Sequence, residues 1–348
     1  MPLMDIPATG ATLAVDKAAD PFISAVESGT FAPIGTPERI VPGVLSVVFV
    51  KGDRAIKVYR HAHTYYGDLI GLEPRRTFYE QDFEWNRTIC PHIYLRVVGV
   101  RNTGRGFMEC APADADDFYI DMCRYDDTHL LTNMLLRGTA TPADFERAVD
   151  VCMQAHEKLS RQLRSEYADL FERGWHDLLT EGIEDLCTLM RRAQPHISPD
   201  DIEAIGRVMH RAVDTSAYFR EFPRYSLVPG IDSHTDNLLI NDGRMELVDS
   251  MMPKTNWRVV DPLNDIAKTV ACAAIVDSRT HAQYAAAAYG RFGNARVETL
   301  PRLLYECRNA TIQWARRHLR GEHELALRYK EYALRTLHEL EREIPKHA

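Results

Sequence analysis

The chain has 348 residues, of which 45% are hydrophobic and 26% are charged, the proportions of an ordinary globular protein with room for two lobes. Its formal net charge is −8 and its pI is near 6.0, so the surface is not one built to neutralise nucleic-acid phosphates. No apolar run in the sequence approaches the ~20 residues that cross a bilayer, and neither nucleic acid nor a membrane is an expected partner.

The first 22 residues are interpreted as an N-terminal extension. They carry early Asp and Pro residues and lack the basic segment and apolar core of a secretory signal. The seven cysteines lie singly along the chain without a CxxC pair, which is typical of reduced thiols and argues against a metal held by sulfur. We therefore expect a cytoplasmic protein.

Residues 23–125 have the pattern of a strand-rich lobe. Between Arg39 and Arg60, short β-branched runs are separated by turn dipeptides at residues 42–43 and 52–53, which predicts an antiparallel meander of three strands. Two more strands are predicted at residues 93–100 and 119–125, with a Gly- and Asp-rich loop between them. The lobe should therefore contain about five strands.

One helix is predicted within this lobe, over residues 73–89. Its buried face is indicated by residues that recur at the i, i+3, i+4 and i+7 spacing. The members of this stripe are Phe78, Tyr79, Asp82, Trp85, Asn86 and Ile89. An acid therefore lies on a face that is otherwise mostly apolar.

Residues 126–348 are predicted to form a larger, helical lobe. Helical periodicity covers residues 142–163, 167–192 and 199–219, with Ser198 as an N-cap, and it returns from Asp265 onward with a break near residues 290–293. A hairpin interrupts the helices, because Asn241-Asp242-Gly243 joins two short apolar runs. No long linker is visible, so we expect the two lobes to share one active site.

Polar residues flank the predicted hairpin on both sides. Asp232-Ser-His-Thr-Asp-Asn237 precedes it and Asp249 follows it. Phosphoryl transfer requires a carboxylate beside the attacking hydroxyl and hard oxygen ligands that hold Mg²⁺ between the phosphates. The sequence therefore predicts Asp232 as the catalytic base and Asn237 and Asp249 as the metal ligands.

Lys57 lies in an apolar strand context, A-I-K-V-Y, just after the second turn. A lysine in this position can extend its ammonium group to the phosphate oxygens of a nucleotide. The alternative is an edge-strand lysine that deters aggregation. The Asp232, Asn237 and Asp249 set favours the nucleotide role.

These segments resemble the protein-kinase-like fold and, within it, the aminoglycoside phosphotransferase family and its bacterial relatives, over roughly residues 38–275. The resemblance implies an α+β, bilobal fold, with ATP and Mg²⁺ as cofactors. It rests on SVVFVKGDRAIKVYR for two sheet strands, RRTFYEQDFEWNRTICPHIYL for the helix, YIDMCRYDDTHLL for the hinge strand, GIDSHTDNLLI for the catalytic loop and ELVDSMMP for the metal-binding segment.

The resemblance also implies a role for each matched residue. The catalytic loop would cover residues 230–240 and the metal-binding hairpin residues 238–252. Asp232 would be the base, His234 the loop histidine beside it, Asn237 and Asp249 the metal ligands, Lys57 the phosphate contact, Asp82 its partner acid with Glu80 and Glu84 as alternatives, Ser46 part of the phosphate-covering turn at residues 41–46, and Met122 and Arg124 part of the hinge.

Two departures from the family pattern concern the helix acid, where Asp82 is one methylene shorter than the usual Glu, and the catalytic loop. Gly230-Ile231 replaces the usual His-Gly, and Ser233 replaces a Leu, so the shape of the loop becomes a question for the structure. Farther along, Asp261 and Asp265 are interpreted first as structural acids.

Three functions are compatible with these residues. The leading one is transfer of the γ-phosphoryl group of ATP to a hydroxyl of a small molecule that resembles an aminoglycoside, a sugar or an amino alcohol. A cationic acceptor is one option, because residues 144–214 contain fifteen acidic and nine basic side chains, and Asp236 would then face the acceptor. Such a surplus is also usual on solvated helix faces.

The other two functions are a protein kinase and a nucleotide-binding pseudokinase. About a dozen residues separate Asp249 from Asp261, too few for a long activation segment, which disfavours the protein kinase. The altered catalytic loop motivates the pseudokinase. The acceptor is expected between the catalytic loop and the helices of residues 142–220.

Overall fold

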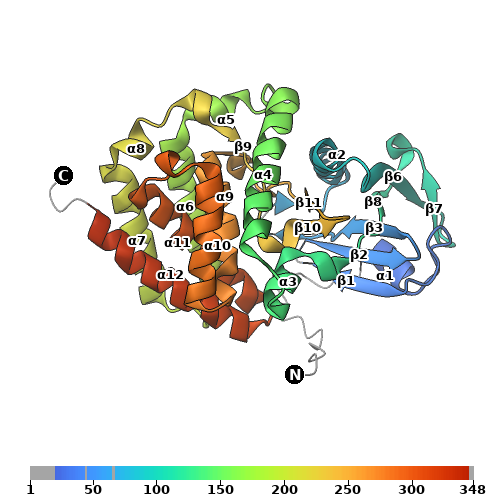
Figure 1. The fold of residues 1–348 in the computed structure, drawn as a ribbon. Helices are drawn as coiled ribbons and strands as arrows, with labels where there is room; N and C mark the ends of the chain where they lie inside the picture. Colours follow the sequence, from blue (N-terminus) through green and yellow to red (C-terminus); the bar gives the residue numbers. More distant parts are fainter. Residues whose placement is uncertain (1–19, 44, 65–66, 345–348) are drawn as a thin grey trace.

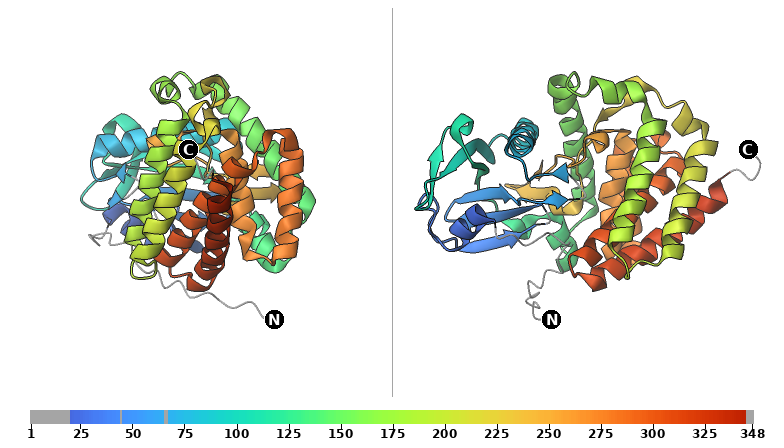
Figure 2. Two further views of the ribbon diagram at one scale, coloured as in Figure 1. Left: turned by 90° about the vertical axis from the view of Figure 1, so that its left-hand side faces the viewer. Right: turned by 180° about the vertical axis from the view of Figure 1, so that it is seen from behind.

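The computed structural model describes residues 20–43, 45–64 and 67–344, and it contains a strand-rich part and a helical part. The two parts lie side by side, with a short hairpin between them (Figure 1). Views from the side and from behind show the same division (Figure 2). The predicted α+β architecture is therefore confirmed.

The strand-rich part is built on one antiparallel sheet of six strands. In spatial order these are β1 (Arg39–Pro42), β2 (Ser46–Lys51), β3 (Arg54–Tyr59), β8 (Asp117–Cys123), β6 (Tyr94–Asn102) and β7 (Phe107–Cys110). A separate two-stranded pair joins β4 (His63–Thr64) to β5 (Gly67–Asp68). The strand β7 was not predicted, since it lies in the region interpreted as a loop. It forms because Gly104 and Gly106 reverse the chain direction and allow pairing with β6.

Helix α1 (Pro21–Glu27) was not predicted, and it corrects the end of the proposed N-terminal extension. Asp20 caps it by accepting hydrogen bonds from the backbone N–H groups of Phe22 and Ile23. Phe22 and Val26 are buried against one face of the sheet. Residues 1–19 of the predicted extension lie outside the described residues.

Helix α2 (Leu72–Ile89) covers the other face of the sheet. The predicted stripe is correct, because five of its six members are buried and Phe78 is partly buried. Tyr79 packs into the core of the sheet, while Trp85 and Ile89 pack into the core of the helical part. The helix therefore belongs to both cores.

The helical part follows the predicted order, but it contains an unpredicted helix at Leu131–Arg137 and four breaks in addition to the predicted one, at Gly174, Ser216, residues 273–277 and residues 320–322. Gly174, at φ +84°, ends one helix and starts the next within residues 167–192, and Ser216 divides residues 199–219 in the same way. The helices are α3 (Leu131–Arg137), α4 (Pro142–Leu163), α5 (Ala168–Arg173), α6 (Trp175–Arg192), α7 (Pro199–Thr215), α8 (Ala217–Arg220), α9 (Pro262–Cys272), α10 (Ser278–Phe292), α11 (Thr299–Leu319) and α12 (His323–Glu343).

The predicted end signals of these helices are confirmed where the structure describes them. Ser198 caps α7 by accepting a hydrogen bond from the backbone N–H of Asp201. Gly293, at φ +108°, ends α10 at the predicted break. Between α8 and α9 lie four short strands, β9 (Val228–Pro229), β10 (Leu238–Asn241), β11 (Arg244–Leu247) and β12 (Val259–Val260).

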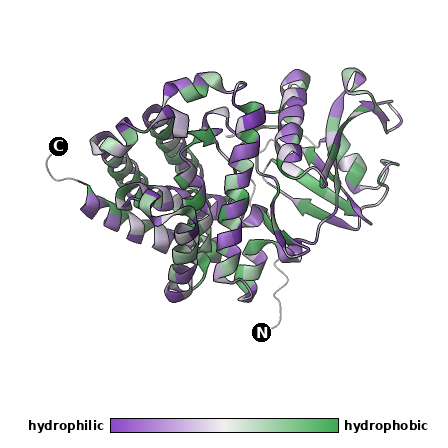
Figure 3. Cartoon of the chain, turned by 45° about the horizontal axis from the view of Figure 1, so that its top comes forward, coloured by the Kyte–Doolittle hydropathy of each residue, from purple (hydrophilic) through white to green (hydrophobic). Residues whose placement is uncertain are grey.

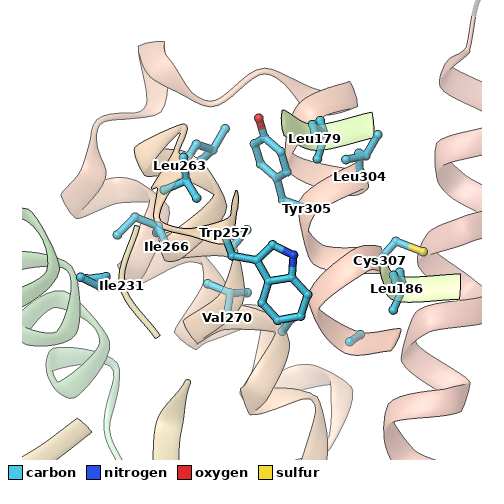
Figure 4. Close-up of a cluster of buried hydrophobic side chains, with 14 of the residues drawn as sticks. Leu179, Leu186, Ile231, Trp257, Leu263, Ile266, Val270, Leu304, Tyr305 and Cys307 are labelled. Atoms are coloured by element: carbon cyan, nitrogen blue, oxygen red, sulfur yellow. The ribbon is translucent and has the colours of Figure 1, made fainter. Parts of the chain in front are cut away.

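The largest core lies among the helices and includes the segment that follows the hairpin. Trp257 packs there with Ile231 of the catalytic loop and with side chains of α6, α9 and α11 (Figure 4). The hydropathy of the helices is mixed along their length, as amphipathic helices require (Figure 3). Among the described residues, no helix combines the length and apolar character that a membrane span requires.

Candidate active site

The catalytic loop begins where the chain leaves β9, at Gly230. A Cβ atom at this position would lie 2.7 Å from the carbonyl oxygen of Trp257 and 2.8 Å from Cγ1 of Val260, so only glycine fits. The backbone N–H of Gly230 donates to the carbonyl of Arg258 at 3.0 Å. Gly230 therefore lets the loop pass directly against the β12 strand.

Asp265 of α9 holds the next residues of the loop in place. Its Oδ2 accepts a hydrogen bond from the backbone N–H of Ile231 at 2.9 Å, and its carbonyl accepts one from Ser233 Oγ at 2.7 Å. His156 of α4 lies 3.0 Å from the same carboxylate. The predicted structural role of Asp265 is confirmed. Ile231 and Ser233, which differ from the family pattern, are both held by hydrogen bonds to Asp265.

Asp232 lies near the start of the loop. Its backbone N–H donates to the carbonyl of Ser250 at 2.8 Å, which ties the loop to the segment after the hairpin. Its carboxylate lies 3.2 Å from His234 Nε2 and 3.6 Å from Lys268 Nζ. Burial alone would raise the pKa of Asp232, but these two neighbours outweigh it and hold the pKa well below its usual range.

Asn237 and Asp249 meet across the hairpin. The Asn237 amide Nδ2 donates to the backbone carbonyls of Asp232 at 2.8 Å and Asp249 at 2.9 Å, so its amide oxygen points away from both. The Asp249 side chain is 55% exposed and its backbone adopts φ +48°, a conformation that Asp tolerates better than most residues. Two hard oxygen donors are thus available to Mg²⁺, which fits the predicted metal site.

The hairpin holds these two residues at the correct spacing. Its strands β10 and β11 pair in register, with Leu238 opposite Leu247. Asp242 and Gly243 form the turn, and both have positive φ, as a two-residue turn of the I′ type requires. The Val248 N–H donates to the carbonyl of Asn237 at 2.9 Å, which continues the pairing to the residue before Asp249.

Lys57 of β3 connects the strand-rich part to the metal-binding segment. Its ammonium group lies 3.1 Å from Asp82 Oδ2 and also contacts the Asp249 carboxylate. Burial alone would lower the pKa of Lys57, but the two carboxylates raise it above its usual value, so the lysine stays charged. The edge-strand alternative is wrong, because β3 lies between β2 and β8 and Lys57 is buried.

The choice of Asp82 as the partner acid is confirmed. Glu80 lies on the exposed face of α2, where it pairs with Arg76 at 3.0 Å, and Glu84 is also exposed. Asp82 is 1% exposed and faces the sheet. The helical stripe identified it correctly because a single face of α2 is turned toward β3.

Two residues that support the metal-binding segment were not assigned a role from the sequence. Asn86, one turn after Asp82, donates from Nδ2 to Asp82 Oδ1 at 2.8 Å and accepts from the Ser250 N–H at 2.7 Å. Tyr94 accepts a hydrogen bond at its hydroxyl from the Asp249 N–H at 2.8 Å. The position of Asn86 on the buried stripe was the available signal for its role.

Lys268 was also missed, although its spacing from Asp265 offered a signal. It lies three residues after Asp265 on α9, at 3.4 Å from that carboxylate, and its ammonium donates to the Ile231 carbonyl at 2.6 Å. It is 5% exposed. Lys268 therefore brings a positive charge beside Asp232 and fixes the loop backbone at the same time.

The predicted nucleotide contacts at the edge of the site have less support from the geometry. The carbonyl of Ser46 accepts a hydrogen bond from the Gly43 N–H at 2.8 Å, so a tight turn precedes β2, but Val44 within it lies outside the described residues. Met122 is buried in the core of the sheet. Arg124 directs both its backbone N–H and its guanidinium to the turn between β2 and β3, at Asp53 and Gly52. Their contacts with nucleotide stay predictions.

Asp236, which we expected to face a cationic acceptor, is already paired with a basic residue of the helical part. Arg317 of α11 donates to both of its carboxylate oxygens, at 3.1 Å and 2.9 Å. His234 Nδ1 lies 3.6 Å from it on the other side. Charged neighbours of Asp232 and Asp236 come from α9 and α11, while His156, within residues 142–220, bonds to Asp265 of α9.

Together these groups form the arrangement that the motifs predicted. A strand lysine pairs with a helix acid, a loop supplies Asp232 and Asn237, and a hairpin brings Asp249 beside both. This is the geometry that the resemblance to the kinase-like fold implies. Chemically, the site can hold a divalent cation, neutralise phosphate charge and accept a proton from a hydroxyl group.

Comparisons with known proteins give distant similarities. No family model matches the chain. Uncharacterised proteins of Mycobacterium bovis and Mycobacterium tuberculosis are 23% identical to it over 229 residues. The match covers 64% of this chain and 43% of those proteins, so the chain spans less than half the length of these relatives.

Solved structures with a similar course of the chain are kinases and phosphotransferases. A choline/ethanolamine kinase family protein from Mesorhizobium loti is 14% identical, with 93% of this chain and 94% of that one covered and a TM-score of 0.38. A choline kinase from Cryptosporidium parvum is 12% identical, with 87% and 89% covered and a TM-score of 0.46. Aminoglycoside 2′-phosphotransferase-IIIa, solved with GDP, is 13% identical, with 92% and 97% covered and a TM-score of 0.46. Similarities of this size carry no inference about the acceptor.

Proposed function

We propose that this protein is an ATP-dependent O-phosphotransferase that moves the γ-phosphoryl group to a hydroxyl of a small molecule. The observation that carries the proposal is the convergence of Lys57 from β3, Asp232 and Asn237 from one loop, and Asp249 from the segment after the hairpin onto one site. The nucleotide and metal roles follow from the chemistry of these groups, because phosphoryl transfer depends on positioning and on charge neutralisation.

Each of these residues would have a distinct task. Asn237 and Asp249 would hold Mg²⁺, which when bound neutralises phosphate charge and fixes the orientation of the transferred group. The Lys57 ammonium, kept charged by its two carboxylates, would contact phosphate oxygens. Asp232, kept ionised by His234 and Lys268, would orient the acceptor hydroxyl and take its proton.

The surroundings of Asp232 favour a neutral hydroxyl compound over a polycationic one. Lys268 lies beside the base, and Arg317 already neutralises Asp236. A cationic acceptor would have to approach these positive charges without an unpaired Asp236 to bind it. We therefore propose sugars and polyols ahead of aminoglycosides as acceptors.

The protein-kinase alternative has little room in this geometry. The segment between Asp249 and Asp261 is packed against the protein, with Arg258 2% exposed and bonded to the carbonyl of Met252, to Gln81 of α2 and to Tyr167. A peptide substrate usually needs an extended activation segment to lie on. The short and buried segment here favours a small acceptor.

The test is a panel of sugars, polyols, amino alcohols and aminoglycosides incubated with Mg-ATP and the full chain, with mass spectrometry to detect a phosphate adduct. We expect an adduct with a neutral hydroxyl compound. Asp232→Asn should lower the transfer rate by about 10²–10⁴-fold, because it removes the proton acceptor and keeps the shape. Nucleotide affinity measured by calorimetry should change little.

The outcomes separate the alternatives. Mg-ATP binding without an adduct in any acceptor class would favour the pseudokinase. An adduct formed only with aminoglycosides would overturn the neutral acceptor class and keep the phosphotransferase. Full transfer by Asp232→Asn would remove Asp232 from the role of base.

A further inference from the structure

Three side chains that can bind a transition metal converge where the C-terminal end of α2 lies next to strand β11 of the hairpin. They are Cys90 at the C-terminus of α2, His92 two residues later and Glu246 of β11. Cys90 Sγ lies 3.8 Å from His92 Nε2 and 3.9 Å from Glu246 Oε2, and the two latter atoms are 3.2 Å apart. A sulfur, a nitrogen and an oxygen thus form one small triangle.

The edges of this triangle are close to those of a metal site. Zinc binds sulfur at about 2.3 Å and imidazole nitrogen or carboxylate oxygen at about 2.0–2.2 Å, so tetrahedral ligands lie about 3.3–3.6 Å apart. The side chains of Cys90, His92 and Glu246 need to move by only a few tenths of an ångström to reach these separations. We propose that they bind a divalent transition-metal ion of the zinc type, with water as a fourth ligand.

Charge and burial support this assignment. A Cys90 thiolate and the Glu246 carboxylate would balance the two charges of the ion, and the neutral His92 imidazole completes the set. Cys90 is 2% exposed, whereas the His92 side chain is 55% exposed and leaves a path from solvent. The carbonyl end of α2 also favours a cation nearby. Lys158 of α4, which donates to the Ile89 carbonyl at 3.4 Å, lies close to Cys90 and carries a charge of the same sign as the ion.

The state of the thiol determines how the ion would bind. Burial, and then the nearby Glu246 carboxylate, raise the pKa of Cys90 to about 12. The thiol is therefore protonated without metal, and binding must release its proton to solvent. The competing description is an ion pair between His92 and Glu246 with a protonated thiol beside it, and Asn241 Nδ2 also reaches Glu246 at 3.4 Å.

A second group of potential ligands, His196, His318 and His323, is a weaker candidate. The rings of His196 and His318 are stacked, with 6° between their planes and 4.8 Å between their centroids. A metal ion lies in the plane of each imidazole that binds it, so two parallel rings cannot share one ion without rotation. This group serves as the comparison for the Cys90 site.

Binding at Cys90, His92 and Glu246 would join two parts of the molecule. Cys90 and His92 lie between α2 and β6 of the strand-rich part, and Glu246 lies three residues before Asp249. The ion would fix the hairpin against the sheet. The proposal concerns metal binding by these side chains and does not depend on the phosphotransfer reaction.

The test is a Co²⁺ titration of the full chain in excess Mg²⁺, which occupies hard oxygen sites. We expect one Co²⁺ per chain with a near-ultraviolet thiolate-to-cobalt absorption band, and loss of that band when Zn²⁺ is added. Cys90→Ser should abolish the band, and His92→Gln and Glu246→Gln should weaken Co²⁺ binding at least about tenfold.

The controls use residues outside the triangle. Cys110→Ser removes a partly exposed thiol elsewhere, and His323→Gln alters the second histidine group, so both should keep the band. Because His92 is exposed, His92→Gln should fold normally, and Zn²⁺ should raise the unfolding temperature of the wild type but not of this variant. A wild type without the band, or one with the same Co²⁺ affinity as His92→Gln, would leave only an ion pair at this position.

Discussion

At the scale of single residues, the candidate active site contains an ammonium group held between two carboxylates. Lys57 contacts Asp82 from the strand-rich part and Asp249 from the metal-binding segment. Asp82 is almost fully buried, while Asp249 is more than half exposed. Asp82 therefore fixes the lysine, and Asp249 is free to share its carboxylate with a metal ion.

Lys57→Met should lower kcat by about 100-fold or more at saturating ATP. The reason is that a positive charge stabilises the transition state most when it lies beside the phosphate oxygens on which negative charge develops. Lys57→Arg, which keeps the charge but not the shape, is the matched variant and should recover little activity. Steady-state kinetics on the acceptor found by the panel would measure both. An unchanged kcat in Lys57→Met would exclude the phosphate contact.

A second residue-scale prediction concerns Asp261, whose carboxylate accepts hydrogen bonds from Tyr218 and Tyr305 at 2.7 Å each. Burial raises its pKa from 3.8 to about 6 despite these hydroxyl groups. Because the folded pKa lies above the unfolded one, the stability gained is complete below pH 4 and is lost as the pH rises through 6. The loss is on the order of 3 kcal/mol.

The amide in Asp261→Asn cannot ionise, so the variant should not lose stability from this position as the pH rises. The free energy of unfolding of the wild type, relative to the variant, should therefore fall between pH 4 and pH 7. Denaturant unfolding at several pH values in this range measures the difference. A constant difference would mean that Asp261 keeps an ordinary pKa in the folded protein.

At the scale of elements, α2 links the lysine pair to the metal-binding segment. Asn86 lies one turn after Asp82 on the same face and bonds both to Asp82 and to the backbone N–H of Ser250. The Ser250 hydroxyl also donates to Asn86, at 3.1 Å. A shift of α2 would therefore displace Lys57 and Asp249 together.

Asn86→Ala should weaken this link. Buried groups lose their partners, so we expect a loss of about 1–3 kcal/mol in the free energy of unfolding and a higher Mg²⁺ concentration for half-maximal rate. Glu84→Ala on the exposed face of the same helix is the control and should change neither quantity. A loss of stability with an unchanged Mg²⁺ requirement would show that Asn86 acts only in packing.

At the scale of the whole molecule, the two parts share one helix. Tyr79 and Phe83 of α2 lie in the core of the sheet, and Trp85 and Ile89 lie in the core of the helices. Leu239 and Val248 of the hairpin also pack in the core of the sheet. The parts should therefore unfold together.

Calorimetry should show one unfolding transition for the wild type. Trp85→Ala removes a fully buried side chain at the junction and should cost about 3–5 kcal/mol. If the packing of Trp85 couples the two parts, the variant should show two unfolding transitions instead of one. Two transitions already present in the wild type would contradict the shared core.

The sequence by itself determined the chemical groups and their local order. The Asp-to-Asn spacing, the Asn-Asp-Gly turn and the helical stripe that includes Asp82 are short-range patterns, fixed by backbone periodicity and turn geometry. These patterns predicted the strand-rich and helical parts and the hairpin between Asn237 and Asp249, and the resemblance to the kinase-like fold added the pairing of Lys57 with Asp82. Gly230 appeared to be a departure, because its close contact with residues 257 and 260 cannot be seen in its own segment.

Only the tertiary structure decided the charges around the site. Arg317 neutralises Asp236 from 81 residues away, and Glu246 meets Cys90 across 156 residues. Lys268 reaches Asp232 because α9 packs beneath the loop. Such pairs depend on which elements pack together and on how deeply each group is buried, and neither follows from local spacing. The availability of a charged side chain to a ligand is therefore a property of the fold, because a partner from a distant segment can neutralise it.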